Sequence, residues 1–316
     1  MEHDDDQLWL RDQWQITKPE HGSVEWLRAR KWRHGMPLIS ASNAAAVHGE
    51  HEFTSMASLA VELLDRGDPV AVEPNEAMRR GTMLEPLLLK WVSDEVETPV
   101  TEPSVMYGYG RLIATLDGTD KHGNVYECKT TTKYVRSLDQ MPRYWYWQGV
   151  HQSLVTGQEQ IGWVVLDGSL TLSMFTQTVT KDEWRQHLEA CDRFLAAIDM
   201  GMMPVEAKPT ADEYARLYSE VSPVAVELPP DTEDRLEWLA ACQATVKRAQ
   251  EQLDQAKADL VALLGASEVG TIDGKERVTW RQQTRTTFDS KRFEAEYPGL
   301  YSEFQKTSKF RVLRTK

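Results

Sequence analysis

The sequence is poor in cysteine and in long apolar runs, and both shortages narrow the class of protein. The three cysteines, Cys128, Cys191 and Cys242, lie far apart and show no metal-ligand spacing. Their odd number and wide spacing argue against a disulfide framework or an iron–sulfur cluster and favour a reducing compartment. No apolar run reaches the length of a membrane span, and the start MEHDDDQLWL is acidic where a secretion signal is basic. We therefore expect a cytoplasmic protein without a membrane segment.

Positive charge is also in deficit. The 316 residues carry 36 Lys and Arg against 49 Asp and Glu, a net charge of −13. The balance reverses over Lys275–Lys316, which holds 11 Lys and Arg against 5 Asp and Glu. An acidic body with a basic tail can still hold DNA in a groove, because charge acts locally and a net negative charge limits adhesion elsewhere. The composition does not exclude a nucleic-acid enzyme.

Apolar residues are plentiful, and their distribution predicts two regions. With 41% hydrophobic residues, the chain can bury a substantial core. Prolines become frequent after Gly201, so we place the first domain at residues 1–208 and an extension at 209–316. In the extension, Asp231–Leu264 carries leucines among charges and predicts a long helix, a candidate coiled-coil arm with imperfect heptads. A short hairpin, two small helical pieces and the basic tail FRVLRTK complete it.

The segment Arg111–Lys133, RLIATLDGTDKHGNVYECKTTTK, predicts two short strands around a turn. Asp117 ends the first strand, while Glu127 and Lys129, two apart, leave the same face of the second. With the main-chain carbonyl of Cys128, the two carboxylates form a hard oxygen set that suits Mg²⁺ or Mn²⁺ better than zinc. A neighbouring ammonium can stabilise phosphate charge or orient water. The pattern indicates metal-assisted phosphodiester hydrolysis; the alternative is a surface hairpin with a solvated Glu/Lys pair.

Two helix starts near the N-terminus suggest an anion site. Ser23–Trp32 predicts a helix with Ser23 as its N-cap, and a second helix is expected near Ser42, which would cap the apolar run Ala44–Val47. A hydroxyl and free N–H groups at a helix start, with guanidinium groups nearby, can bind a phosphate. The alternative is a capping serine beside solvated arginines.

Two further helices each carry polar residues among apolar ones. In the helix predicted over Asn75–Glu95, Glu85 lies in GTMLEP among apolar neighbours, as either a solvated edge residue or a metal ligand. Pro142–Gly157 predicts a helix with Tyr144, Gln148, His151 and Gln152 on one face.

Taken in order, these motifs resemble those of the YqaJ-type viral recombinases, the lambda exonuclease-like family of the PD-(D/E)xK nuclease superfamily. The resemblance covers about residues 23–200 and consists of W-x3-R, ISAS, GTMLEP, LDGT followed by YECK, and a glutamine-bearing helix. Leu116-Asp117 stands where the superfamily usually has Pro-Asp. The resemblance implies an α/β (α+β) fold with a central mixed β-sheet flanked by helices, a restriction-endonuclease-like core with a helical C-terminal extension.

The resemblance also implies roles for individual residues. Asp117, Glu127 and the Cys128 carbonyl would bind metal, and Glu85 would support it. Lys129 would position or activate the attacking water. Gln148 would orient that water or the scissile phosphate, with Gln152 as a second candidate; the arginine and serine that bind the terminal 5′-phosphate in the family correspond to Arg30 and Ser42, with Arg28 or Arg33 as alternatives to Arg30.

The activity implied is that of a Mg²⁺-dependent 5′-to-3′ exodeoxyribonuclease, with Mn²⁺ as a possible substitute. It would act on ends of linear double-stranded DNA and leave 3′ overhangs for phage-type homologous recombination. A single-strand annealing protein and a homo-oligomer such as a trimer are the expected partners. The alternatives are a structure-selective or restriction endonuclease, or a non-catalytic DNA-binding or scaffold module for an annealing protein. The acidic set argues against the last, since carboxylates near phosphates are unfavourable unless a cation lies between them.

Overall fold

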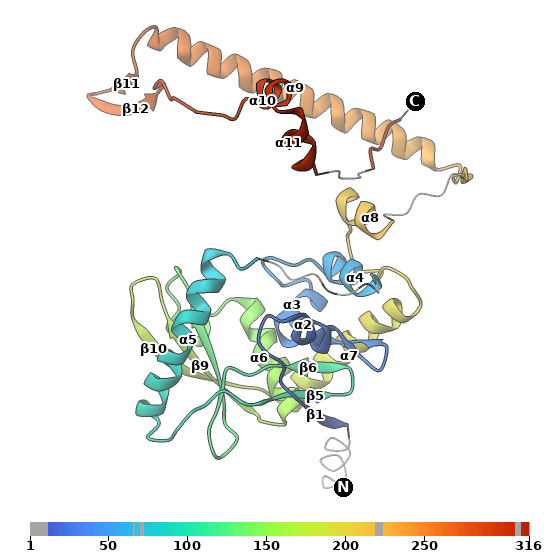
Figure 1. The fold of residues 1–316 in the computed structure, drawn as a ribbon, viewed down its shortest axis with the longest axis vertical. Helices are drawn as coiled ribbons and strands as arrows, with labels where there is room; N and C mark the ends of the chain where they lie inside the picture. Colours follow the sequence, from blue (N-terminus) through green and yellow to red (C-terminus); the bar gives the residue numbers. More distant parts are fainter. Residues whose placement is uncertain are drawn as a thin grey trace. The chain divides into compact units, whose positions relative to one another are not determined.

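The computed structural model describes residues 12–65, 67, 69, 73–218, 224–306 and 311–315. The chain divides into two compact units, Met1–Tyr218 and Ser219–Lys316, each of which is described by itself (Figure 1). Several predicted features lie partly or wholly outside the described residues: the acidic N-terminal decapeptide, Arg66 at the end of the helix that the sequence predicts over Ser55–Arg66, Pro223, and the two outer residues of FRVLRTK.

The helices of the first unit include those predicted over Ser23–Trp32, Asn75–Glu95 and Pro142–Gly157, with shifts of a few residues at their ends. They are α2 (Val24–Lys31), α3 (Ala44–Val47), α4 (Met56–Leu64), α5 (Glu76–Glu95), α6 (Arg143–Thr156), α7 (Lys181–Asp199) and α8 (Ala211–Leu217), with the 3₁₀ turns η1 (Ala41–Asn43) and η2 (Leu138–Gln140). The predicted N-cap of α2 is confirmed, because the Ser23 side chain accepts a hydrogen bond from the N–H of Trp26.

The strands of this unit form two four-stranded sheets and a short ribbon. They are β1 (Gln13–Thr17), β2 (Trp32–Arg33), β3 (Met36–Pro37), β4 (Ile39–Ser40), β5 (Val105–Tyr109), β6 (Leu112–Ala114), β7 (Gly118–Thr119), β8 (Val125–Thr130), β9 (Gln160–Leu166) and β10 (Leu172–Thr178). The sheet orders are β1-β5-β6-β4 and β10-β9-β8-β7, and β2 pairs with β3. Each four-stranded sheet is mixed, because β4–β6 and β8–β9 are parallel and the other pairs antiparallel. The α/β class with mixed sheets and flanking helices is confirmed, with the strands divided between two sheets.

The predicted pairing of Arg111–Leu116 with Val125–Lys129 is wrong. β6 lies in the other sheet, between β5 and β4, and the short β7 takes its place beside β8. All three residues of β6 are buried, which is typical of a central strand rather than one arm of an exposed hairpin. Asp117 therefore lies at the passage of the chain from one sheet to the other.

Helix α6 runs through the main core, packed against α3, α7 and strands of both sheets (Figure 1). Trp145, Trp147, Val150 and Leu154 are each at most 4% exposed. Because apolar partners cover most of this helix, the polar residues His151, Gln152 and Ser153 are also buried, and buried polar groups require hydrogen-bond partners. The contacts of α6 therefore bear directly on the site.

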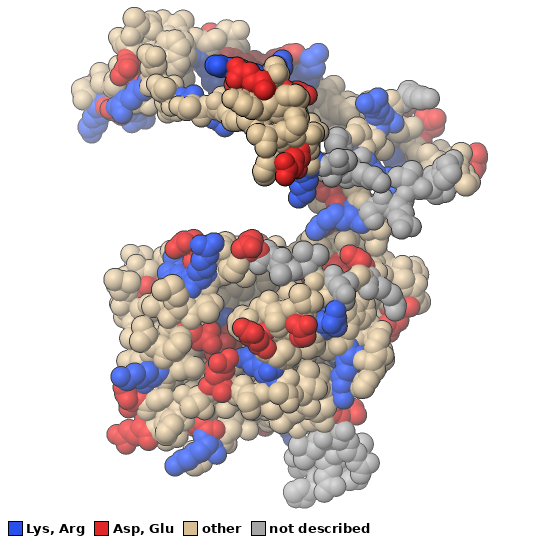
Figure 2. All heavy atoms as spheres, in the orientation of Figure 1, with Lys and Arg blue, Asp and Glu red and all other residues tan. Residues whose placement is uncertain are grey.

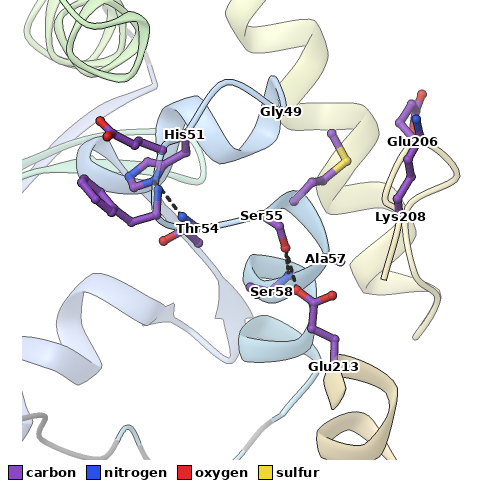
Figure 3. Close-up of a pocket in the computed structure, with 12 residues that line it drawn as sticks. Gly49, His51, Thr54, Ser55, Ala57, Ser58, Glu206, Lys208 and Glu213 are labelled. Atoms are coloured by element: carbon purple, nitrogen blue, oxygen red, sulfur yellow. Dashed lines mark hydrogen bonds between the residues drawn. The ribbon is translucent and has the colours of Figure 1, made fainter. Parts of the chain in front are cut away.

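The first unit extends to Tyr218, past residue 208, where the proline-rich composition begins. Helix α8 is held to α4 by Glu213, whose carboxylate accepts hydrogen bonds from Ser55 Oγ (2.6 Å) and Ser58 Oγ (2.5 Å) (Figure 3). It also accepts from the N–H of Thr210, 2.6 Å away, in a capping box at the start of α8. A hollow of about 590 Å³ lies beside these residues.

The second unit confirms the predicted long helix, hairpin and two short helical pieces. They are α9 (Thr232–Leu264), the hairpin β11 (Val269–Ile272) and β12 (Lys275–Thr279), α10 (Ser290–Glu296) and α11 (Pro298–Glu303). Over the described parts of both units, no helix combines the length and the apolar character needed to cross a membrane.

Candidate active site

Asp117 and the strand β8 are joined by a main-chain hydrogen bond. The Asp117 Oδ2 accepts from the N–H of Cys128 at 2.8 Å. The next residue, Gly118, lies so close to Leu89 and Val100 that a Cβ would stand 2.6 to 2.7 Å from their side chains. Because Gly118 has no side chain, β7 can lie close to α5 and pair with β8. This arrangement holds the Asp117 carboxylate beside the strand that carries Glu127.

Glu127 is the centre of a buried hydrogen-bond network. Only 3% of it is exposed, and its Oε1 accepts from Lys129 Nζ (2.6 Å) and Gln148 Nε2 (2.5 Å). The Gln148 Oε1 in turn accepts from Lys129 Nζ at 3.0 Å, so the three side chains close a ring. Oε2 of Glu127 accepts from Gln152 Nε2 at 2.6 Å. The sequence predicted that Glu127, Lys129 and Gln148 lie together, and the structure places them so.

The charges of the site shift the pKa values of its members. Burial raises the pKa of Asp117 well above its usual range, and the charge of Glu127 adds to the rise while Lys129 opposes it. Burial would lower the pKa of Lys129, but the charges of Glu127 and Asp117 outweigh it and raise that pKa. Lys129 is therefore an ammonium at neutral pH, whereas the carboxylates around it repel one another.

Glu85 reaches this group from α5, which packs on β8. Burial raises its pKa, and the charges of Glu102 and Glu127 raise it further. Glu85 is followed by Pro86, which cannot donate the usual helical hydrogen bond, so this turn of α5 lacks one bond of the helix. The charge of Glu85 raises the pKa of Asp117, so the two carboxylates belong to one electrostatic environment, and the metal-supporting role of Glu85 stays a prediction.

The donor chemistry of the site suits a hard cation. Carboxylate oxygens are the ligands that Mg²⁺ and Mn²⁺ prefer, and a cation would offset the burial and the carboxylate repulsion that raise the pKa of Asp117. Among the described residues, however, no three or more His, Cys, Asp or Glu side chains are grouped so as to hold a metal ion. Asp117, directly before β7, is hydrogen-bonded to the strand β8 that carries Glu127, and metal binding by these two residues, by Glu85 and by the Cys128 carbonyl stays a prediction.

Arg30 and Ser42 meet as the sequence predicted. Arg30 Nη2 donates to Ser42 Oγ at 2.6 Å and to Ser40 Oγ at 3.4 Å. Burial lowers the pKa of Arg30 to about 10, and the charges of Glu62 and Glu127 oppose this shift, so the guanidinium stays positive at neutral pH. Its Nε is buried without a hydrogen-bond partner. A cavity of about 230 Å³, lined by these groups and Lys31, adjoins them.

The expected capping role of Ser42 is wrong. Ser42 lies inside η1, and α3 starts after Asn43, which makes no side-chain capping bond. The hydroxyl of Ser42 turns to Arg30 instead. Of the alternative arginines, Arg28 is exposed on α2 and Arg33 stacks on the ring of Trp14, with 3.9 Å between its Cζ and the ring centroid.

The structure contains a hydrogen-bonded chain of three histidines that the sequence did not predict. His151 Nε2 lies 3.1 Å from the carbonyl oxygen of Ile113, its Nδ1 lies 2.9 Å from His187 Nε2, and His187 Nδ1 lies 2.8 Å from His48 Nε2. A carbonyl can only accept, so neutral rings must each donate toward Ile113. Burial lowers the pKa of His48 to about 4 and that of His151 to about 3. The three histidines come from α6, α7 and the end of α3, so no local pattern joins them.

Figure 2 shows Lys and Arg interspersed with Asp and Glu over the visible face of each unit, without one continuous basic patch on that face.

Comparison with known proteins agrees with the motif order. Residues 25–159 match the model of the YqaJ-like viral recombinase domain, a stretch that contains every candidate residue from Arg28 to Gln152. The predicted resemblance is thereby confirmed over these residues. Among curated proteins there is no match.

Several solved structures are similar to this chain. An alkaline exonuclease from Laribacter hongkongensis is 21% identical, with 56% of this chain and 93% of that chain covered and a TM-score of 0.46. Its complex with dAMP is 20% identical, with the same coverage and a TM-score of 0.44. A phage-related exonuclease from Haemophilus somnus is 10% identical, with 52% and 96% covered and a TM-score of 0.41.

Proposed function

We propose that the YqaJ-like domain of this protein is a metal-dependent exodeoxyribonuclease that acts on linear double-stranded DNA. In this proposal it degrades one strand from the 5′ end and leaves 3′ single-stranded overhangs for homologous recombination. The observation that supports it best is the closed ring of Glu127, Lys129 and Gln148 beside the Asp117 carboxylate. A structural ion pair would not need a second carboxylate held against it.

In this proposal, each side chain of the ring has its own role in hydrolysis. Lys129, held as an ammonium by Glu127 and Asp117, places a positive charge where a phosphate oxygen or an attacking water can accept a hydrogen bond from Nζ. Gln148 holds both Lys129 and Glu127 and so fixes their separation. Gln152 fixes the second oxygen of Glu127. These contacts preorganise the site before DNA arrives.

A divalent cation, Mg²⁺ with Mn²⁺ as a substitute, would be held by Asp117 and Glu127 with Glu85 in support. When bound, it would supply Lewis-acid stabilisation of the phosphate and lower the pKa of water. Arg30 and Ser42 would bind a terminal 5′-phosphate, because the guanidinium is positive, its Nε lacks a partner and a cavity adjoins it. The charge of Glu127 acts on Arg30, so the two groups belong to one electrostatic environment.

The test uses the purified full chain and linear duplex DNA labelled at either the 5′ or the 3′ end, with and without a 5′-phosphate. We expect release of mononucleotides from the 5′-phosphorylated strand in Mg²⁺ and none in chelator. Release from the 3′ end would overturn the polarity. Digestion of closed circular DNA would indicate an endonuclease, and DNA binding without hydrolysis would indicate a binding module.

Arg30→Gln and Arg28→Gln form a matched pair for the phosphate site, since both arginines lie on α2. We expect Arg30→Gln to remove the preference for 5′-phosphorylated over 5′-hydroxyl ends and Arg28→Gln to retain it. The opposite result would transfer the phosphate-binding role to Arg28.

A further inference from the structure

Helix α9 carries a complete apolar seam on one side. Its residues recur at alternating intervals of three and four: Leu239, Cys242, Val246, Ala249, Leu253, Ala256, Leu260 and Leu263. The leucines alone give imperfect heptads, but when the small apolar residues are counted the pattern fills four successive heptads. A strict period of 3.5 residues keeps such a seam facing one partner helix in a left-handed coiled coil.

Most of this seam is exposed in the second unit. The exposed fractions are 69% for Val246, 49% for Leu253, 49% for Leu260 and 85% for Leu263. At the other end of the seam, Leu239 and Cys242 are half-buried. Helices in proteins owe most of their stability to packing of an apolar face, and a row of exposed leucines marks an interaction surface. The described residues of this unit leave that face open from Val246 onward.

The sides of the seam are almost free of charge. The flanking positions are Gln243, Thr245, Gln250, Gln252, Lys257 and Asp259. One cation and one anion cannot oppose the approach of an identical helix by like-charge repulsion. The other charged residues along the seam lie on the outer side of the helix, where for example Lys247 Nζ is 4.0 Å from a Glu251 carboxylate oxygen. This charge distribution suits a second copy of α9 as the partner.

The order of large and small residues along the seam predicts different packing for a parallel and an antiparallel pair of α9 helices. If two copies ran parallel, each residue would face itself, so the layers of paired alanines at Ala249 and Ala256 would lie next to layers of paired leucines at Leu253 and Leu260. The leucine layers would hold the helices apart and leave cavities at the alanines, and cavities are destabilising. If the copies ran antiparallel, small residues could face large ones in adjacent layers.

We propose that α9 pairs with α9 of a second copy of this chain as an antiparallel coiled coil. The arrangement that uses the whole seam places Leu239 against Leu263 of the other copy, Cys242 against Leu260, Val246 against Ala256, and Ala249 against Leu253. Each alanine then faces a larger side chain. At 1.5 Å per residue, the paired segment is about 36 Å long. The surface lies outside the residues that match the recombinase family, so it adds an assembly function to the proposed nuclease.

The first experiment compares two identical substitutions two residues apart on α9. Ala256→Asp puts a carboxylate into the seam, whereas Ala258→Asp puts it on the outer side with the same helix propensity. Sedimentation equilibrium of the full chain should show self-association through α9 for the wild type and, equally, for Ala258→Asp. Ala256→Asp should raise the dimer dissociation constant by roughly a hundredfold, because two carboxylates lose their water. Equal association of the two variants, or a monomeric wild type, would overturn the proposal.

The second experiment tests the orientation with the native thiol. In the antiparallel pair Cys242 faces Leu260 of the other copy, so Leu260→Cys should give a disulfide-linked dimer on mild oxidation. Cys242→Ser in that background should abolish the link. The wild type should form no disulfide through Cys242, since the Cys242 residues of the two chains lie far apart in an antiparallel pair. An equally efficient link through Cys242 in the wild type would indicate a parallel pair and overturn the orientation.

Discussion

Helix α6 in the first unit and helix α9 in the second differ in how much of their surface is covered. On α6 most residues from Trp145 onward are buried, polar ones included, and Gln148, His151 and Gln152 each have partners from other elements. On α9 only Leu264 is buried among its 33 residues. Tertiary packing fixes the positions of the groups that carry the proposed chemistry, whereas α9 leaves its apolar face free for assembly. The comparison separates a packed region that holds the proposed catalytic groups from an exposed apolar face.

The largest expected effect is the loss of DNA cleavage when the Lys129 ammonium is removed from the packed site. Lys129→Ala should lower the rate of DNA hydrolysis by roughly 10³-fold, because a preorganised charge at the phosphate or water is lost. DNA binding should be largely retained. Lys121→Ala, an exposed lysine in the turn before β8, serves as the control and should cleave normally. Wild-type turnover by Lys129→Ala would remove Lys129 from the mechanism.

Substitutions that shorten an apolar side chain should destabilise the first unit more than the second. Leu154→Ala, at a fully buried position of α6, should lower the free energy of unfolding of the first unit by about 2–5 kcal/mol. Leu300→Ala in α11, where the side chain is 48% exposed, should cost less than about 0.5 kcal/mol. Denaturant unfolding of each variant gives both values. Similar costs would show that the second unit has a core as tight as the first.

Acid should weaken the first unit through its histidine chain. An unfolded histidine binds its proton near pH 6.5, whereas burial holds the pKa of His48 near 4 and that of His151 near 3. The unfolded state therefore binds more protons below pH 6.5, and stability that is fully present above that pH falls as the pH drops toward 4.

The histidine prediction is checked by the melting temperature of the first unit between pH 7 and 4. His48→Gln keeps a donor toward His187 but cannot titrate, so its melting temperature should fall less steeply with acid than that of the wild type. His122→Gln, at an exposed turn, should leave the slope unchanged. Identical slopes for all three proteins would assign the acid sensitivity to other groups.

The smallest effect is expected at the end of the first unit. Hydrogen bonds from Ser55, Ser58 and Thr210 lower the pKa of Glu213 to about 2, so this attachment of α8 is complete above pH 4.5 and is lost as the pH falls toward 2. Glu213→Gln should release α8 locally at neutral pH, with faster proteolysis near Tyr218 and an unchanged core. Asp212→Asn, at the neighbouring exposed position, is the control. Equal proteolysis of both would show that other contacts hold α8.

Much of the site could be predicted because its residues lie in local patterns. Glu127 and Lys129 are two positions apart on a strand, so their side chains lie on one face of it. Gln148 and Gln152 are four positions apart on a helix, so they also share a face. Long-range choices could not be predicted in this way. β6 was expected beside β8 and lies in the other sheet, and Ser42 was expected to cap a helix and binds Arg30.

The sequence by itself determined which residues could do chemistry and which face of each helix or strand they occupy, since side-chain direction follows from the period of the local backbone. It also determined the seam of α9, which is a property of one helix. Only the tertiary structure decided that Gln152 holds Glu127 and that three histidines form a chain. These contacts join elements distant in sequence, and the choice among them depends on how the whole core packs.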